Sequence, residues 1–152
     1  MPSEHQYEFH VIERQSFEDL AVANQFIEEK YFNAEPFWIY SYKHKSLFAE
    51  VDKILKKRRS WDQQRDLYGD QESSCLEVCF DDDNYIDSVK LRIDFGVSYV
   101  EVLFELLWLF RTKDLVIIDE NLRRQPLNFE IIDRVIQSSK RWEKYFWGEV
   151  KE

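Results

Sequence analysis

The sequence predicts an α+β fold, with a mixed, partly antiparallel sheet of about five strands and four helices in the order β-α-β-α-β-β-α-β-α. Three observations predict it. Strand-like and helix-like periodicities alternate along the chain, the strand patterns at 76–80 and 88–95 follow each other around a short turn, and only three Gly and three Pro occur in 152 residues. Scarce Gly and Pro favour regular structure over loops. The length and the 44% hydrophobic content suit one domain over residues 1–152.

In the first half of the chain we expect two strands, two helices and a long loop. Apolar residues that alternate with polar ones predict a strand at 7–11, and an aromatic run predicts another at 37–42. A capping-box pattern predicts a helix from Ser16 to about Phe32. An apolar stripe predicts a second helix over 46–59, and the polar segment 60–74 is expected to be the loop.

The second half carries the clearest strand. In 88–95 every second residue is apolar, which predicts an antiparallel hairpin with 76–80 and one buried face. A capping box at Ser98–Glu101 predicts a helix that is apolar nearly all round and lies centrally in the core. The run 115–118 is apolar on both faces, which indicates an interior strand. A single last helix is expected after Asn128.

Negative charge is concentrated in one segment. The chain has net charge −9, from 30 acids and 21 bases, and residues 66–89 hold eight acids and no Lys or Arg. A concentrated field attracts a cation or a basic protein surface and repels nucleic acid. We therefore expect the acidic turn to bind a basic protein partner. Its candidate residues are Asp81, Asp82, Asp83 and Asp87.

A second candidate surface is aromatic. If 37–42 is a strand, then Trp38, Tyr40 and Tyr42 lie on one of its faces. Tyr and Trp are favoured anchors of protein interfaces because they bury much area at little cost in entropy. The alternative is that a helix covers this face, which would make the three rings part of the core.

These two features favour a small acidic protein-binding module over an enzyme. Such a module could be an inhibitor that masks a basic protein, with toxin-neutralising immunity proteins as the physical analogy. No cofactor is expected. A homodimer without a ligand is a third hypothesis. The basic run 53–59 could instead fold back on the acids and weaken the external field.

The alternative hypothesis is a metal-dependent hydrolase or nuclease that uses the carboxylates of the 77–94 hairpin. Glu77, Asp87 and Asp94 would be its ligands, with Lys90 as the charge-stabilising group. The acidic turn does not fit a calcium loop, because Ile86 stands at the Gly position and Arg92 at the twelfth. No nucleophile motif of the Gly-x-Ser-x-Gly type occurs. The carboxylates are more simply explained as cross-strand ion pairs.

The compartment is inferred from the cysteines and the N-terminus. Cys75 and Cys79 are too far apart on one strand for a disulfide, which fits a reducing compartment. No charged segment followed by an apolar run opens the chain, and no apolar run is long enough to span a membrane. We therefore expect a soluble cytoplasmic protein.

Overall fold

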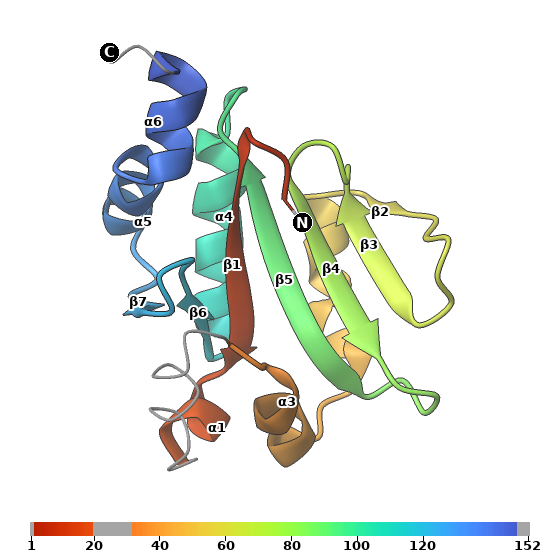
Figure 1. Cartoon of the computed structure of the whole chain (residues 1–152). Helices are drawn as coiled ribbons and strands as arrows, with labels where there is room; N and C mark the ends of the chain where they lie inside the picture. The colour runs from red at the N-terminus through yellow and green to blue at the C-terminus, as the bar shows by residue number, and fades with distance from the viewer. Residues whose placement is uncertain (1, 20–31, 149–152) are drawn as a thin grey trace.

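The computed structural model describes residues 2–19 and 32–148, and it shows an antiparallel sheet with helices around it (Figure 1). The sheet order is β2-β3-β4-β5-β1-β6-β7. The strands are Gln6–Glu13 (β1), Lys57–Arg58 (β2), Arg65–Gly69 (β3), Cys75–Phe80 (β4), Ile86–Asp94 (β5), Leu115–Ile118 (β6) and Arg124–Gln125 (β7). The helices are Arg14–Asp19 (α1), Glu35–Ser41 (α3), the 3₁₀ helix Lys45–Lys53 (η1), Val100–Thr112 (α4), Phe129–Gln137 (α5) and Lys140–Trp147 (α6).

The α+β class is confirmed, but the predicted count is wrong. Within the described ranges the chain forms seven strands and six helices, rather than five and four. The predicted mixed sheet is also wrong, because all of the described strand pairs are antiparallel. Two of the additional strands, β2 and β7, are two residues long and lie at the sheet edges. Such short strands carry no periodicity that a sequence pattern could reveal.

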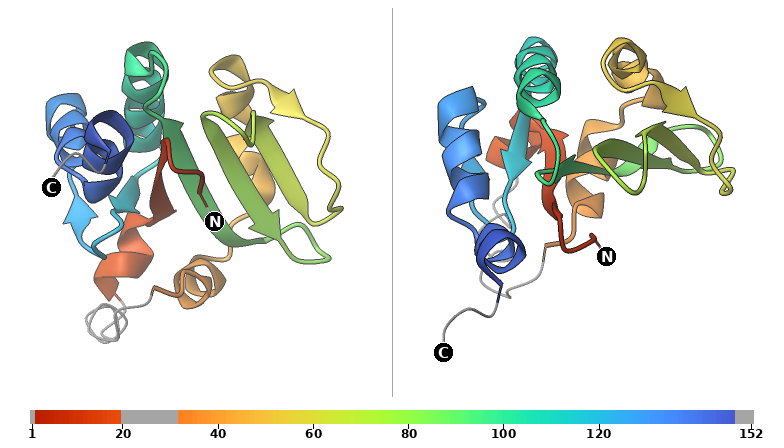
Figure 2. Two further views of the ribbon diagram at one scale, coloured as in Figure 1. Left: turned by 45° about the horizontal axis from the view of Figure 1, so that its top comes forward. Right: turned by 90° about the horizontal axis from the view of Figure 1, so that it is seen from above.

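The predicted hairpin of β4 and β5 is confirmed and forms the centre of the sheet. Leu76 pairs with Leu91 and Val78 with Val89, and β1 lies on the other side of β5 with Phe9 opposite Leu91. These side chains are buried on one face of the sheet. Helices α4 and η1 lie side by side over that face (Figure 2, right). Strand β6 is interior, as predicted, because it lies between β1 and β7.

The predicted strand at 37–42 is wrong, because the segment forms helix α3. Pro36 lies in the first turn, where its fixed φ favours a helix start. Phe37 and Trp38 are buried, and the Trp38 indole N–H donates to the Val11 carbonyl at 3.0 Å. Helical rotation takes Tyr40 off the Trp38 face, and Tyr42 follows the last helical residue in the left-handed conformation, so the two rings are 54% and 65% exposed.

The prediction for 46–74 also needs correction. A 3₁₀ helix ends at Lys53, and the expected loop contains strand β3, on which Tyr68 and Leu67 are buried. Asp66 lies opposite Val78 and forms ion pairs with Lys45 and Lys57, each at 3.5 Å. The segment forms a strand because of these tertiary contacts, although its own sequence is mostly polar.

The helix boundaries differ from the predicted capping boxes. Ser16 lies inside α1, where its N–H and hydroxyl donate to Glu13, and residues 20–31 of the predicted helix lie outside the described ranges. Helix α4 begins after Tyr99 without a side-chain cap. The single last helix that the sequence predicts is two helices in the structure, because Ser139 caps a new helix by accepting from the Trp142 N–H at 3.1 Å. None of the described helices is long and apolar enough to cross a membrane.

Candidate protein-binding surface

The end of α3 and the turn between β4 and β5 are held together by backbone hydrogen bonds. The Lys45 N–H donates to the Asn84 carbonyl at 2.9 Å, and the Ile86 N–H donates to the Lys43 carbonyl at 2.8 Å. His44 and Tyr85 form an isolated β-bridge between these bonds. Figure 1 shows α3 and the turn at the same end of the sheet. The pairing therefore brings a helix terminus to the acidic turn.

Two tyrosines stack where these segments meet. The rings of Tyr42 and Tyr85 lie 4.1 Å apart between centroids and are inclined by 11°. Tyr42 has the left-handed conformation of a helix C-cap, with φ 53°, and is 65% exposed. Its pKa is raised by the neighbouring Tyr85 phenol, by desolvation beside that ring and then by the charges of Asp83 and Asp81. The Tyr42 ring thus lies in the field of the acidic turn.

The acidic turn has one structural carboxylate and two exposed ones. Asp81 Oδ1 accepts from the backbone N–H groups of Asp83 and Tyr85, each at 2.9 Å. This arrangement is an Asx-type turn, in which Asp shapes the local backbone. Asp82 and Asp83 are exposed, and Asp82 accepts from the Gln64 amide. The turn therefore directs negative charge outward.

Asp87 and Glu35 extend the negative charge toward α3. The pKa of Asp87 is raised by partial burial first, and then by the charges of Glu35 and Asp81. Ile39 is 62% exposed and lies four residues after Glu35, which places both on one face of α3. We call this region the acidic–aromatic surface. It comprises Glu35, Ile39, Tyr42, Asp81, Asp82, Asp83, Tyr85 and Asp87, and exposed Lys43 borders it.

The structure brings five of the seven predicted binding residues into this surface. Asp81, Asp82, Asp83, Asp87 and Tyr42 lie there.

The other two predicted residues lie elsewhere. Trp38 is fully buried in the core, so it cannot contact a partner. Tyr40 is exposed, but its hydroxyl donates to Asp19 at 3.4 Å, on the α1 side of the helix. Glu35, Ile39 and Tyr85 were not predicted. The spacing of Glu35, Ile39 and Tyr42 is a helical stripe that the strand interpretation concealed.

Two of the eight clustered acids, Asp66 and Glu77, are neutralised by ion pairs within the fold. Asp66 pairs with Lys45 and Lys57, so part of the basic run does fold back on the acids. Glu77 lies 3.9 Å from both Arg65 and Arg92. The ion pairs of residues 2–19 and 32–148 use none of Asp81, Asp82, Asp83 and Asp87. Apart from exposed Asp70 and Glu72 in the loop before β4, the outward negative charge of the cluster therefore lies in the acidic–aromatic surface.

The candidate metal ligands do not gather. Glu77 faces Lys90 across the hairpin, whereas Asp94 accepts from the Ser73 hydroxyl at 2.7 Å and donates its backbone N–H to the Ser74 hydroxyl at 2.9 Å. Asp87 and Asp94 lie seven residues apart on β5, a separation of about 23 Å. In the part of the chain that the structure describes, no three His, Cys, Asp or Glu side chains are placed to hold a metal ion.

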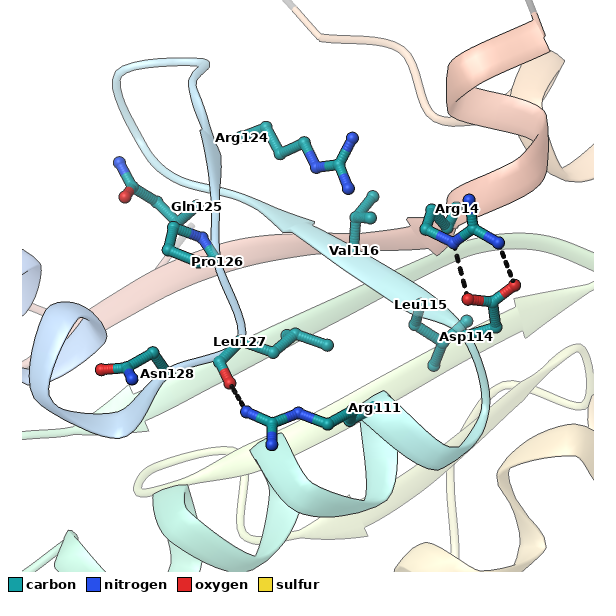
Figure 3. A pocket seen from close by; sticks show the side chains of 10 residues that line it. All are labelled: Arg14, Arg111, Asp114, Leu115, Val116, Arg124, Gln125, Pro126, Leu127 and Asn128. Carbon is teal, nitrogen blue, oxygen red and sulfur yellow. Dashed lines mark hydrogen bonds and ion pairs between the residues drawn. The ribbon is translucent and has the colours of Figure 1, made fainter.

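A cavity of about 270 Å³ lies where α1, α4 and the β6–β7 edge meet (Figure 3). Three arginines line it, and each is already engaged. Arg14 binds Asp114 through two bonds of 2.6 and 2.9 Å, and Arg111 donates to the Leu127 carbonyl. Arg124 lies 3.3 Å from Glu18. These contacts join the sheet edge to the helices, which accounts for the arginines structurally.

The Cys75 and Cys79 thiols are both free, and burial raises the pKa of the Cys75 thiol to about 12. This shift disfavours the reactive thiolate.

Comparisons of the chain with protein-family models, with curated proteins and with solved structures found no match.

Proposed function

We propose that this protein binds a basic region of a protein partner through the acidic–aromatic surface and masks that region, as a small inhibitor or an immunity-type protein does. The observation that carries the proposal is the stack of Tyr42 on Tyr85 beside the acidic turn. It joins, in one place, the charge and the aromatic area that such binding requires.

The two components contribute to different steps of binding. The carboxylates of Asp82, Asp83 and Asp87 steer a basic partner toward the surface and raise the association rate. Tyr42 and Ile39 offer exposed apolar area that a partner can bury, and buried aromatic anchors slow dissociation. Stacking on Tyr85 holds the Tyr42 ring in place before binding, which lowers the entropy that binding costs.

Charge repulsion within the surface supports a binding role. Partial burial first, and then the charges of Glu35 and Asp81, raise the pKa of Asp87, so its ionised form is disfavoured in the free protein. A basic partner would relieve this repulsion. Acids that are unfavourable in the free protein and favourable in a complex are typical of binding sites.

Affinity capture tests the proposal. The immobilised protein is exposed to a lysate of its source cell at about 50 mM salt and washed at about 500 mM, where charges are screened within a few ångströms. A parallel bait carries Asp82→Asn, Asp83→Asn and Asp87→Asn. We expect a basic protein that the wild-type bait retains at low salt and releases at high salt, and that the variant does not retain.

A matched control separates the site from the overall charge. Glu4, Glu130 and Glu143 are exposed and lie outside the surface, so their change to Gln alters the net charge by the same amount. This control bait should retain the partner. If both variants retain the same proteins as the wild type, the proposal is wrong.

A further inference from the structure

The outer face of α4 carries a row of large apolar side chains. Val100, Phe104 and Trp108 follow each other at a spacing of four residues and are 52%, 58% and 62% exposed. Val97, just before the helix, is 56% exposed. The core needs none of them, because Leu103, Leu106, Leu107 and Phe110 of the same helix are buried on its inner face.

We propose that this face of α4 is a two-fold interface between two copies of the chain, with the two α4 helices antiparallel. The interface is separate from the acidic–aromatic surface and does not depend on the proposed function. Closed two-fold dimers are the commonest assemblies of soluble proteins, and their interfaces are enriched in exposed aromatic residues of this kind.

The charges around the row favour a second copy as its occupant. Three acids and three bases lie on or beside this face, and Glu50 pairs with Lys113, so the formal charges of the face balance; the six residues are Glu50, Glu101, Glu105, Lys53, Arg111 and Lys113. The whole chain has net charge −9, and two copies therefore repel each other over most approaches. A balanced face is where two copies meet with the least repulsion.

The order of residues along α4 is complementary to itself in the antiparallel sense. The pair Glu101 and Arg111 and the pair Phe104 and Trp108 are both centred on position 106. One two-fold axis at that position therefore sets Phe104 opposite Trp108 of the second copy, and Glu101 opposite its Arg111. Each contact occurs twice, as a two-fold interface requires.

The surroundings of the row leave room for these contacts. A groove of about 470 Å³ runs between α4 and η1, with Phe104, Trp108 and Ile54 among its lining residues. Side chains of an approaching helix can enter it. Arg111 donates one N–H to the Leu127 carbonyl, and the remaining donors of its guanidinium are available to a carboxylate.

Sedimentation velocity over about 1 to 100 µM protein tests the interface, since that range covers micromolar self-association. We expect a dimer that dissociates on dilution. Phe104→Glu combined with Trp108→Glu should leave a monomer at every concentration. Trp61 is 77% exposed and lies between η1 and β3, so Trp61→Ser is the matched control and should dimerise like the wild type.

Charge reversal tests the antiparallel register. Glu101→Arg alone and Arg111→Glu alone should each weaken dimerisation at least about five-fold, because each sets like charges opposite each other. The two changes together should restore it. Circular dichroism melts show whether each variant is folded. A wild-type protein that is monomeric at the highest concentration overturns the proposal, as do assemblies larger than a dimer or a dimer that the α4 variants leave intact.

Discussion

Tyr42, at the end of α3, stacks on Tyr85, just after the β4–β5 turn, with 4.1 Å between ring centroids. The first ring is exposed and the second supports it. If this stack is the anchor of the binding surface, Tyr42→Ala should weaken partner binding about ten-fold, with little change in the free energy of unfolding. Titration calorimetry measures the affinity. Tyr40→Ala is the control, since Tyr40 is similarly exposed but faces α1, and an equal loss with Tyr40→Ala would contradict the assignment.

Asp87 should show opposite effects on stability and on binding. Its pKa is raised in the folded state, so its ionised form destabilises the fold at neutral pH. Asp87→Asn should therefore stabilise the protein at pH 7 by a few tenths of a kcal/mol, a small gain because solvent screens this partly exposed group.

The pH dependence checks the cause of this gain. As pH falls through the folded-state pKa, Asp87 becomes protonated and resembles Asn, so the gain should vanish below about pH 4. Urea unfolding at several pH values measures it. If the gain in the free energy of unfolding were the same at low pH, charge would not be its cause. The Asp87→Asn variant should also bind the partner less tightly at pH 7.

Trp38 should matter for stability and not for recognition. Its ring is fully buried, and its N–H donates to the Val11 carbonyl. Trp38→Ala should cost about 4 kcal/mol, from the cavity and the lost hydrogen bond. Denaturant unfolding gives the value. A cost below about 1 kcal/mol would mean that the ring is not packed as described.

Glu77 is expected to stabilise the open face of the sheet. The residue is 7% exposed and lies 3.9 Å from both Arg65 and Arg92. The Nε atom of Arg92 is buried and has no hydrogen-bond partner among the described residues. Glu77→Ala leaves Arg65 without its ion-pair partner and leaves Arg92 with Glu8, 3.9 Å away, as its counter-charge, which should cost about 2 kcal/mol in urea unfolding. Glu72→Ala, at an exposed position of the preceding loop, should cost less than about 0.5 kcal/mol.

The strands that the sequence predicts well are those with a long pattern. Strand β5 lies within the alternating run 88–95 over most of its length and pairs on both sides, so the buried face of that part follows from spacing alone. Strand β3 has only Leu67 and Tyr68 as apolar signals, and it depends on Asp66 meeting Lys45 and Lys57, which are distant in sequence. No local pattern contains such contacts.

Helix α3 shows why the candidate binding surface was only partly predictable. The run Phe37–Tyr42 is mostly aromatic, so its composition favours a strand, and only Pro36 indicates a helix start. The acidic turn was predicted from its composition. Its stacking partner was not, because the contact of Tyr42 with Tyr85 arises when α3 docks beside β5.

The most direct test of the proposed function is the salt dependence of partner affinity, measured by titration calorimetry with the captured basic protein. The wild-type protein should bind at least about ten-fold more weakly at 500 mM than at about 50 mM salt. The triple variant with Asn at Asp82, Asp83 and Asp87 should bind more weakly than the wild type at low salt and should lose most of the salt dependence. The control variant with Gln at Glu4, Glu130 and Glu143 should keep the salt dependence of the wild type. Equal affinities and salt dependences for the two variants would contradict the account.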